Sequence, residues 1–280
     1  MNYYPLIRGR QYDLLALIDA VQAGLSERII PIVEPVKDIA ALPRLVKAFA
    51  KAQHPLYILQ NPQVGQYGLL AQPRFPIPYP LPTPVQAARY FDGTDAPAPL
   101  LLTQTYAQAQ LLAPTQLALV IDEARVRALP HDRRILLADH TPSRRYTADY
   151  YTVQDELYQY PLKFQQGVGL ADYPLASVNY DEHGYPQRAI ALHLLYEREG
   201  ALWVHHFVSV NNADFSKPGA KFLEALATLT PWLAVHPDAA TQATMQLERL
   251  STDQHFPGLG TVRKLELAHW LAIYGRWLDC

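Results

Sequence analysis

Short apolar runs recur along the chain, and they limit the fold more than any other feature of the sequence. Each run is about 4 to 8 residues long, is rich in aliphatic and β-branched residues, and ends at polar residues. Because the runs are continuous rather than alternating, they are typical of strands buried on both faces, as in parallel sheets covered by helices. Eight runs can be counted, at residues 4–7, 29–33, 56–59, 100–103, 117–121, 135–138, 167–171 and 190–195.

Segments with helical spacing of apolar residues lie between several of these runs, at 12–21, 39–50 and 106–113. Strand and helix alternating along a chain of 280 residues predict a βα architecture, and eight strands favour an irregular (β/α)8 barrel. We expect residues 1–280 to form a single α/β barrel domain; the alternative is an open α/β sheet with a mixed edge. If the barrel closes, the runs at 4–7 and 190–195 must be hydrogen-bonded neighbours.

Two insertions interrupt the regular pattern. Residues 73–99 hold eight of the 24 prolines, which predicts an extended loop followed by a helix at 85–90. Residues 143–160 are rich in tyrosine and show no helical stripe. After the eighth run, the sequence predicts a β-hairpin at 189–210 and a C-terminal helix at 262–278 that closes the outer layer.

The overall composition excludes several classes of protein. The chain has 24 Lys and Arg against 26 Asp and Glu, so no extended nucleic-acid surface is predicted, because phosphate binding needs a basic surplus. The single cysteine, Cys280, cannot form an internal disulfide or a thiolate cluster. No apolar run reaches the roughly 18 residues that span a bilayer, so we expect a soluble, cytoplasmic protein with no membrane partner.

Polar or ionisable residues follow each predicted strand. The carboxyl ends of strands in a parallel barrel meet at one mouth, where active sites lie. The alternative is that strand ends simply meet solvent, since turns favour Asp and Asn. The residues at this predicted mouth are Arg8, Arg10, Gln11, Glu34, Gln60, Asn61, Gln104, Asp122, Glu123, Asp139, His140, Asp172 and His193.

Four of these residues are candidate catalytic groups: Glu34, Asp139, Asp172 and His193. Acidic residues on neighbouring strands supply the oxygen ligands of Mg²⁺ or Mn²⁺, which makes Asp122 and Asp139 candidate metal ligands. The same carboxylates can act as an acid/base pair if burial separates their pKa values. The sequence leaves these alternatives open.

Two arginines and two amides are candidate substrate-binding groups. Arg8 and Arg10 lie in an IRGRQ turn and can clamp a phosphate or carboxylate; the alternative is a salt bridge to a carboxylate of the mouth. Asn61 and Gln104 can hydrogen-bond a substrate. We expect Glu34, Asp139 and Asp172 to meet in one polar pocket beside an arginine, because three uncompensated carboxylates would repel one another.

Three histidines lie within the predicted hairpin. One of His205 and His206 is expected to share a face with His193, and a cluster of three would bind Zn²⁺. The alternative is that they are hydrogen-bonded core residues. No GxGxxG, P-loop, HExxH or GxSxG motif is present.

Several blocks resemble the uncharacterised beta protein family of bacterial and phage-borne proteins. They are YYPLIRGRQYDLLAL, IIPIVEPV, LLADHTPSRRYTADY, GVGLADY and AIALHLLYEREGALWVHHFVS, and the resemblance covers most of the chain. It implies a barrel-like α/β protein of mobile-element or defence neighbourhoods, sometimes beside a nuclease-like partner. The turn NYDEHGYP departs from the Gly- and Ser-rich turn of relatives. The recurrent positions map onto Arg8, Gly9, Glu34, Pro35, Asp139, Arg144, Arg145, Gly169, Asp172, His193, His206 and Ser209.

Two functional hypotheses follow. The first is an enzyme, such as a metal-dependent hydrolase, that acts at the barrel mouth on a phosphorylated or nucleotide-like small molecule with a divalent cation. The second is a non-catalytic scaffold that binds a protein partner through its aromatic and proline-rich loops. The prolines reduce the entropy lost on docking, and tyrosines give large contact area with few rotatable bonds.

Overall fold

The structure, a computed structural model, describes residues 1–93, 97–130, 132–140, 144, 146–182 and 188–280. The chain divides into two compact units. The first comprises Met1–Asp139 and Gln165–Tyr180, and the second comprises His140–Phe164 and Asp181–Cys280. The single domain expected from the sequence stays a prediction.

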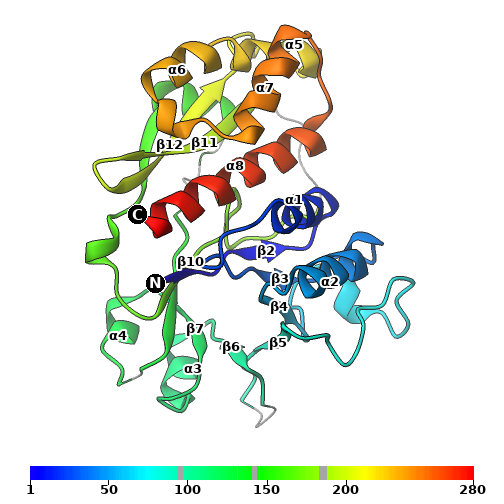
Figure 1. Cartoon of the computed structure of the whole chain (residues 1–280), viewed down its shortest axis with the longest axis vertical. Coiled ribbons are helices and arrows are strands. Elements are labelled where there is room, and N and C mark those ends of the chain that lie inside the picture. The colour runs from blue at the N-terminus through cyan, green and yellow to red at the C-terminus, as the bar shows by residue number, and fades with distance from the viewer. Residues whose placement is uncertain (94–96, 131, 141–143, 145, 183–187) are drawn as a thin grey trace. The chain divides into compact units, whose positions relative to one another are not determined.

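A curled, open parallel sheet of nine strands forms the first unit (Figure 1). Its strand order is β1-β10-β8-β7-β6-β5-β4-β3-β2, and every neighbouring pair is parallel. The mixed α/β class is confirmed, whereas a complete (β/α)8 barrel is not, because the sheet is open. The strands are β1 (Asn2–Tyr3), β2 (Leu6–Arg8), β3 (Ile32–Glu34), β4 (Leu56–Leu59), β5 (Val85–Tyr90), β6 (Leu100–Leu102), β7 (Ala118–Ile121), β8 (Arg134–Leu137) and β10 (Gly169–Ala171).

Helices flank this sheet. Apolar residues of α3, α4 and the outer faces of β7 and β8 form one cluster, and α1 packs against α2. A second cluster fills the concave side of the sheet with alternate residues of successive strands, such as Leu6, Ile32 and Leu119. The helices are α1 (Gln11–Gln22), α2 (Ala41–Ala52), α3 (Tyr106–Leu111) and α4 (Ala124–Arg127), with a short 3-10 turn, η1, at Tyr67–Leu69.

One expected element of this unit is wrong. Residues Val85–Tyr90 form strand β5, not a helix, and pair with β4 and β6. The sequence VQAARY contains two alanines and an arginine, which favour a helix in isolation, but pairing on both edges overrides that preference.

A three-stranded antiparallel sheet, in the order β11-β12-β9, and a set of helices form the second unit. The predicted hairpin is confirmed as β11 (Ala191–Arg198) and β12 (Ala201–Val208). Its two-residue turn, Glu199–Gly200, has positive φ at both residues (56° and 78°), the geometry that matches the twist of a hairpin. The run at 190–195 therefore belongs to this sheet and is not the neighbour of 4–7 that the barrel prediction required.

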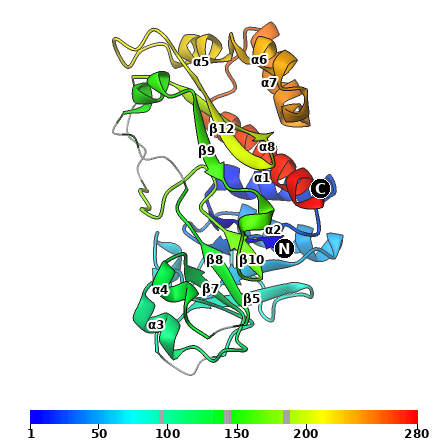
Figure 2. The same cartoon turned by 90° about the vertical axis from the view of Figure 1, so that its left-hand side faces the viewer.

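The insertion at 143–160 contributes structure rather than a bare loop. Its last part forms β9 (Asp155–Gln159), which pairs with β12 (Figure 2). The predicted C-terminal helix is confirmed as α8 (Leu259–Asp279). It packs on β11 of the second sheet, so its expected role in closing the outer layer of the barrel is not confirmed. The remaining elements are the 3-10 turns η2 (Thr147–Thr152), η3 (Leu162–Phe164) and η4 (Pro237–Ala239), and the helices α5 (Pro218–Leu226), α6 (Leu229–Val235) and α7 (Gln242–Thr252).

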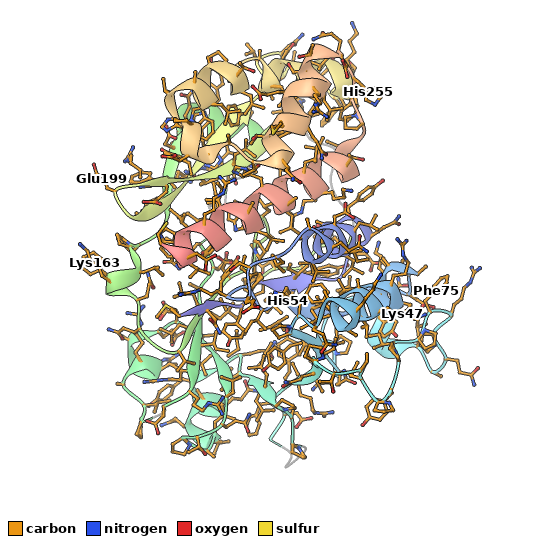
Figure 3. The ribbon with its side chains drawn as sticks, in the orientation of Figure 1. Lys47, His54, Phe75, Lys163, Glu199 and His255 are labelled. Atoms are coloured by element: carbon orange, nitrogen blue, oxygen red, sulfur yellow. The ribbon has the colours of Figure 1, made fainter. Side chains whose placement is uncertain are left out.

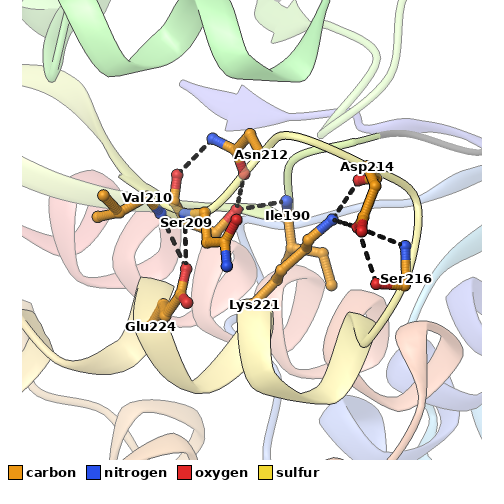
Figure 4. Close-up of polar contacts among 9 residues, drawn as sticks. Ile190, Ser209, Val210, Asn212, Asp214, Ser216, Lys221 and Glu224 are labelled. Carbon is orange, nitrogen blue, oxygen red and sulfur yellow. Dashed lines mark hydrogen bonds and ion pairs between the residues drawn. The ribbon is translucent and has the colours of Figure 1, made fainter.

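The segment that connects β12 to α5 is tied to the helix by polar contacts (Figure 4). The Glu224 carboxylate accepts hydrogen bonds from the main-chain N–H groups of Val210 (3.1 Å) and Asn211 (2.9 Å). The buried Lys221 ammonium donates to the main-chain oxygen of Asp214. These groups all find partners within the segment, so we assign them a structural role.

Among the residues described, no helix combines the length and the apolar character needed to cross a membrane.

Candidate functional site

The carboxyl ends of β2 and β3 bring together the two residues with the strongest sequence signal. Arg8 and Glu34 stand opposite each other in the parallel register, and both are buried. The Arg8 guanidinium forms an ion pair with the Glu34 carboxylate through Nη1 and Oε2. Gly9 allows this approach, since a Cβ there would lie 3.0 Å from the carbonyl oxygen of Glu34. The salt-bridge interpretation of Arg8 therefore holds, at the position where the mouth was predicted.

Two tyrosines complete the surroundings of the ion pair. The Tyr90 hydroxyl, from the end of β5, donates to Glu34 Oε2 at 2.9 Å and accepts from Arg8 Nη1 at 3.3 Å. The Tyr173 ring lies 5.2 Å from the Arg8 guanidinium carbon, a cation–π contact. Burial raises the pKa of both phenols, and the Arg8 charge opposes that rise. Both hydroxyls are therefore protonated at neutral pH.

Each member of the ion pair also holds a loop. Glu34 Oε1 accepts from the main-chain N–H groups of Gln63 (2.6 Å) and Val64 (3.3 Å), just after β4. Arg8 Nη2 donates to the carbonyl oxygen of Val178, after β10, at 3.3 Å. The ion pair therefore connects the loop after β4 with the loop after β10.

One donor of Arg8 is left over. Its Nε–H is buried and has no hydrogen-bond partner among the described residues. Buried polar groups are nearly always paired, so this N–H needs an acceptor, either a water molecule or a ligand. Arg10, two residues on, is exposed and lies over the Tyr180 ring at 5.1 Å.

The three carboxylates expected in one pocket have different hydrogen-bond partners. Glu34 faces Arg8, as described above. Asp139 accepts from the main-chain N–H of Val178 at 3.0 Å. Asp172 is 1% exposed and accepts from the Tyr3 hydroxyl at 2.5 Å. Asp172 immediately precedes Tyr173, and neighbouring residues of an extended chain point to opposite faces, so its carboxylate turns away from the face that carries Arg8.

The other predicted mouth residues make local contacts. The Asn61 side chain makes two hydrogen bonds to the main chain of Tyr90. Its Nδ2 donates to the Tyr90 carbonyl oxygen and its Oδ1 accepts from the Tyr90 N–H, both at 2.9 Å. Gln104 lies before α3, where its main-chain N–H donates to Gln108. Asp122 is paired with Arg127 on the surface. These contacts explain the local structure and leave the binding roles of Asn61 and Gln104 as predictions.

The proposed metal ligands do not assemble in the part of the chain that the structure describes. There, no group of three or more His, Cys, Asp or Glu side chains is placed to hold a metal ion. Asp122 pairs with an arginine and Asp139 accepts from a main-chain N–H. Their role as metal ligands stays a prediction.

His193 belongs to the second unit, whereas the other candidate catalytic residues belong to the first. It shares a face with His206, as expected, and their Nδ1 atoms lie 2.6 Å apart. His206 Nε2 contacts the Glu156 carboxylate at 3.0 Å. Burial lowers the pKa of His193 to about 3 and that of His206 to about 4, so both are neutral imidazoles at neutral pH. If Nε2–H of His206 donates to Glu156, His206 Nδ1 accepts from His193.

His205 does not join the other two histidines. It points to the opposite face of β12, because side chains alternate along a strand, and contacts Asp155 through Nδ1 at 2.8 Å. The predicted zinc cluster of three histidines is therefore wrong, and the core interpretation of these residues holds. Arg144, which the family resemblance singles out, pairs with Glu156; Arg145 lies outside the described residues.

The sequence did not point to Tyr90, Tyr173 or the main-chain groups at 63, 64 and 178. Tyr90 was hidden because its strand was expected to be a helix. Tyr173 follows GLAD, two residues beyond the apolar run, where an aromatic residue gives no signal of its own.

Comparisons of the chain with family models, with curated proteins and with solved structures found no match.

Proposed function

We propose that the first unit binds a phosphorylated or nucleotide-like small molecule at the carboxyl edge of its sheet and acts on it as an enzyme. The observation that carries this proposal is the buried Arg8 Nε–H, which lacks a hydrogen-bond partner among the described residues. Guanidinium groups recognise phosphate and carboxylate oxygens through several parallel hydrogen bonds, and the Nε–H edge is one side of that fork.

The surroundings of Arg8 support an anionic ligand. Glu34 and Tyr90 hold the guanidinium in one orientation, so less conformational entropy is lost when a ligand binds. Arg10 adds a second positive charge in the same turn. A ring of the ligand has aromatic neighbours in Tyr173 and Tyr180.

The roles of the carboxylates differ from those expected. Glu34 accepts from Arg8, Tyr90, Gln63 and Val64, so its lone pairs are engaged and we assign it a positioning role rather than that of a base. We propose Asp139, near the loop that carries Val178, as the group that faces the reacting part of the ligand. The divalent cation stays a prediction: among the described residues, no group of three or more His, Cys, Asp or Glu side chains is placed to hold it.

A thermal-shift panel tests the proposal. Inorganic phosphate, a sugar phosphate and nucleoside mono- and diphosphates are added to the full chain, each with and without Mg²⁺. At least one phosphorylated compound is expected to raise Tm, with its unphosphorylated counterpart inactive, because a ligand that binds only the folded state stabilises it. A panel in which no phosphorylated compound raises Tm at millimolar concentration contradicts the proposal.

Scaffold function is the second candidate, and one observation favours it. Leu69 and Tyr79, on the long loop between β4 and β5, are 84% and 86% exposed. The loop is nonetheless fixed, since Asp38 accepts from the main-chain N–H groups of Arg74 (2.6 Å) and Phe75 (2.8 Å), and Figure 3 shows Phe75 on it. A fixed loop that presents apolar side chains suits a protein partner. Limited proteolysis of this loop that no candidate partner slows would count against this function.

We also propose that the chain is a member of the beta protein family and that its sheet closes as a barrel between β2 and the end of β10, rather than between residues 4–7 and 190–195 as the sequence predicted. β1 and β2 are separated only by Tyr4 and Pro5 and stand at the two ends of the strand order. Leu6 N donates to the carbonyl oxygen of Asp172, and Ile32 N donates to that of Pro5, both at 2.9 Å. Slow amide exchange at both Leu6 and Ile32 is expected for a closed barrel; fast exchange at Leu6 alone would show an open edge.

A further inference from the structure

The two edge strands of the sheet in the second unit, β11 and β9, differ in whether side chains cover their outward main-chain groups. At the β11 edge, α8 supplies two polar side chains. Glu266 Oε1 accepts from the main-chain N–H of His193 at 2.7 Å, and His269 Nε2 lies 2.7 Å from the carbonyl oxygen of Leu195. These are the main-chain groups that point away from β12, so this edge is closed to further pairing.

Within the described residues of the second unit, no side chain covers the β9 edge in this way. The hydrogen bond from His206 N to the carbonyl oxygen of Gln154 (2.8 Å) fixes which main-chain groups face β12. In the observed register, Asp155 is opposite His205 and Leu157 is opposite Trp203, so the N–H and C=O groups of Asp155 and Leu157 point outward. Within the described chain, no hydrogen bond takes either N–H group.

Side chains along this edge form an exposed row of defined chemistry. Val153, Asp155 and Leu157 are two residues apart and share a face. Val153 and Leu157 are 36% and 37% exposed, and the Asp155 side chain is 39% exposed. Burial alone would raise the pKa of Asp155, but hydrogen bonds from His205 and Tyr196 outweigh it and lower that pKa, so the centre of the row is negatively charged at neutral pH.

This pattern distinguishes between possible occupants. In an antiparallel pair centred on Asp155, a second copy of β9 would place like charges opposite each other, which is unfavourable. A strand with a basic residue between two apolar residues places each side chain opposite its complement. The charge pattern therefore favours a different protein segment over a second copy of this chain.

We propose that the β9 edge binds an extended segment of another protein by strand addition, with a Lys or Arg flanked two residues away on each side by apolar residues. Main-chain hydrogen bonds to Asp155 and Leu157 supply the pairing, and contacts with Val153, Asp155 and Leu157 supply the selectivity. This inference does not depend on the function proposed for the first unit.

Defined peptides test the proposal on the full chain. The probe is a fluorescently labelled Thr-Val-Thr-Lys-Thr-Val-Thr peptide, and binding is followed by anisotropy and by amide exchange at Leu157. The same peptide with Glu in place of Lys is expected to bind about fivefold more weakly, as one unfavourable cross-strand charge pair predicts. A peptide with methyl groups on the main-chain nitrogens that would pair with β9 is expected not to bind, because it lacks those main-chain donors.

Two variants of the chain serve as a matched pair. Leu157→Pro removes the outward N–H without removing a hydrogen bond to β12 and is expected to abolish binding; Leu157→Ala keeps the N–H and is expected to retain most of it. Circular dichroism checks that both are folded, and the N-methylated peptide gives the same test on the unaltered chain. The proposal is overturned if the Lys peptide does not bind, or if N-methylation leaves its affinity unchanged.

Discussion

Arg8 and Glu34 stand opposite each other in the β2–β3 register, and their side chains form a buried ion pair. The register places both side chains on the concave face, and the apolar cluster beneath them excludes water. A charge in such a place needs a partner, which is why the pair is interdependent.

Removing one partner alone is therefore expected to be costly. Glu34→Ala leaves the Arg8 charge buried and unpaired, and we expect it to lower the free energy of unfolding by about 3–5 kcal/mol. The double change Arg8→Met with Glu34→Gln removes both charges, and its stability is expected to stay close to that of the original chain. Urea denaturation of the three proteins measures this; a cost below about 1 kcal/mol for Glu34→Ala would show that the pair is solvated.

The loop between β4 and β5 is expected to depend on Asp38. Asp38→Ala removes the acceptor of the hydrogen bonds from Arg74 N and Phe75 N, so we expect faster proteolytic cleavage within 70–84 and little change in the midpoint of unfolding. Asp253→Ala, which removes an acidic residue at the end of α7, is the control. Equal cleavage rates in the two variants would contradict the anchoring role.

Closure of the β11 edge by α8 has a measurable consequence. Because Glu266 accepts from the His193 N–H, Glu266→Ala is expected to speed amide exchange at His193 by about tenfold, the effect of losing roughly 1.4 kcal/mol of protection. The amide of Leu157, on the uncovered edge, is expected to exchange fast in both proteins. Unchanged protection at His193 would mean that another group covers it.

Acid is expected to destabilise the second unit through its buried histidines. His269 is fully buried between Thr241 and Leu195, and burial lowers its pKa to about 4. The unfolded chain takes up the proton first, near the ordinary histidine pKa of about 6.5, so stability is complete above that pH and is lost as the pH falls toward 4.

Replacing this histidine isolates its contribution. His269→Gln keeps a donor and an acceptor but does not titrate, so the loss of stability between neutral pH and pH 4 is expected to shrink by a few kcal/mol at most, with His193 and His206 still contributing. Urea midpoints across this pH range give the slope. An identical slope in the variant would show that His269 is not buried in the folded state.

Many strands of the fold can be predicted from local sequence, and the others form only because neighbouring strands pair with them. Leu56–Leu59 and Ala118–Ile121 were predictable because a continuous apolar run has few other uses than a doubly buried strand. Val85–Tyr90 and Asp155–Gln159 were not, since their composition does not demand a strand and only their neighbours make them strands.

The same division applies to the site. Arg8 and Glu34 were identified because they directly follow apolar runs, whereas the structure pairs Asp172 with the Tyr3 hydroxyl and leaves its catalytic role a prediction. A shift of one residue in an extended segment reverses the direction of a side chain, and short runs do not set the register to one residue. His193 was assigned to the mouth because its run was counted as a barrel strand, when it pairs only within the second unit.

Binding of a phosphorylated ligand with and without Arg8 tests the central claim most directly. The compound that raises Tm most is titrated calorimetrically into the original chain and into the folded Arg8→Met, Glu34→Gln double variant. Asp122→Asn is the control, because Asp122 pairs with Arg127 rather than with Arg8. We expect the control to bind like the original chain and the double variant to lose at least about tenfold in affinity, as removal of a charge-assisted hydrogen bond predicts. Equal affinity of the double variant and the original chain would contradict the claim that Arg8 recognises the ligand.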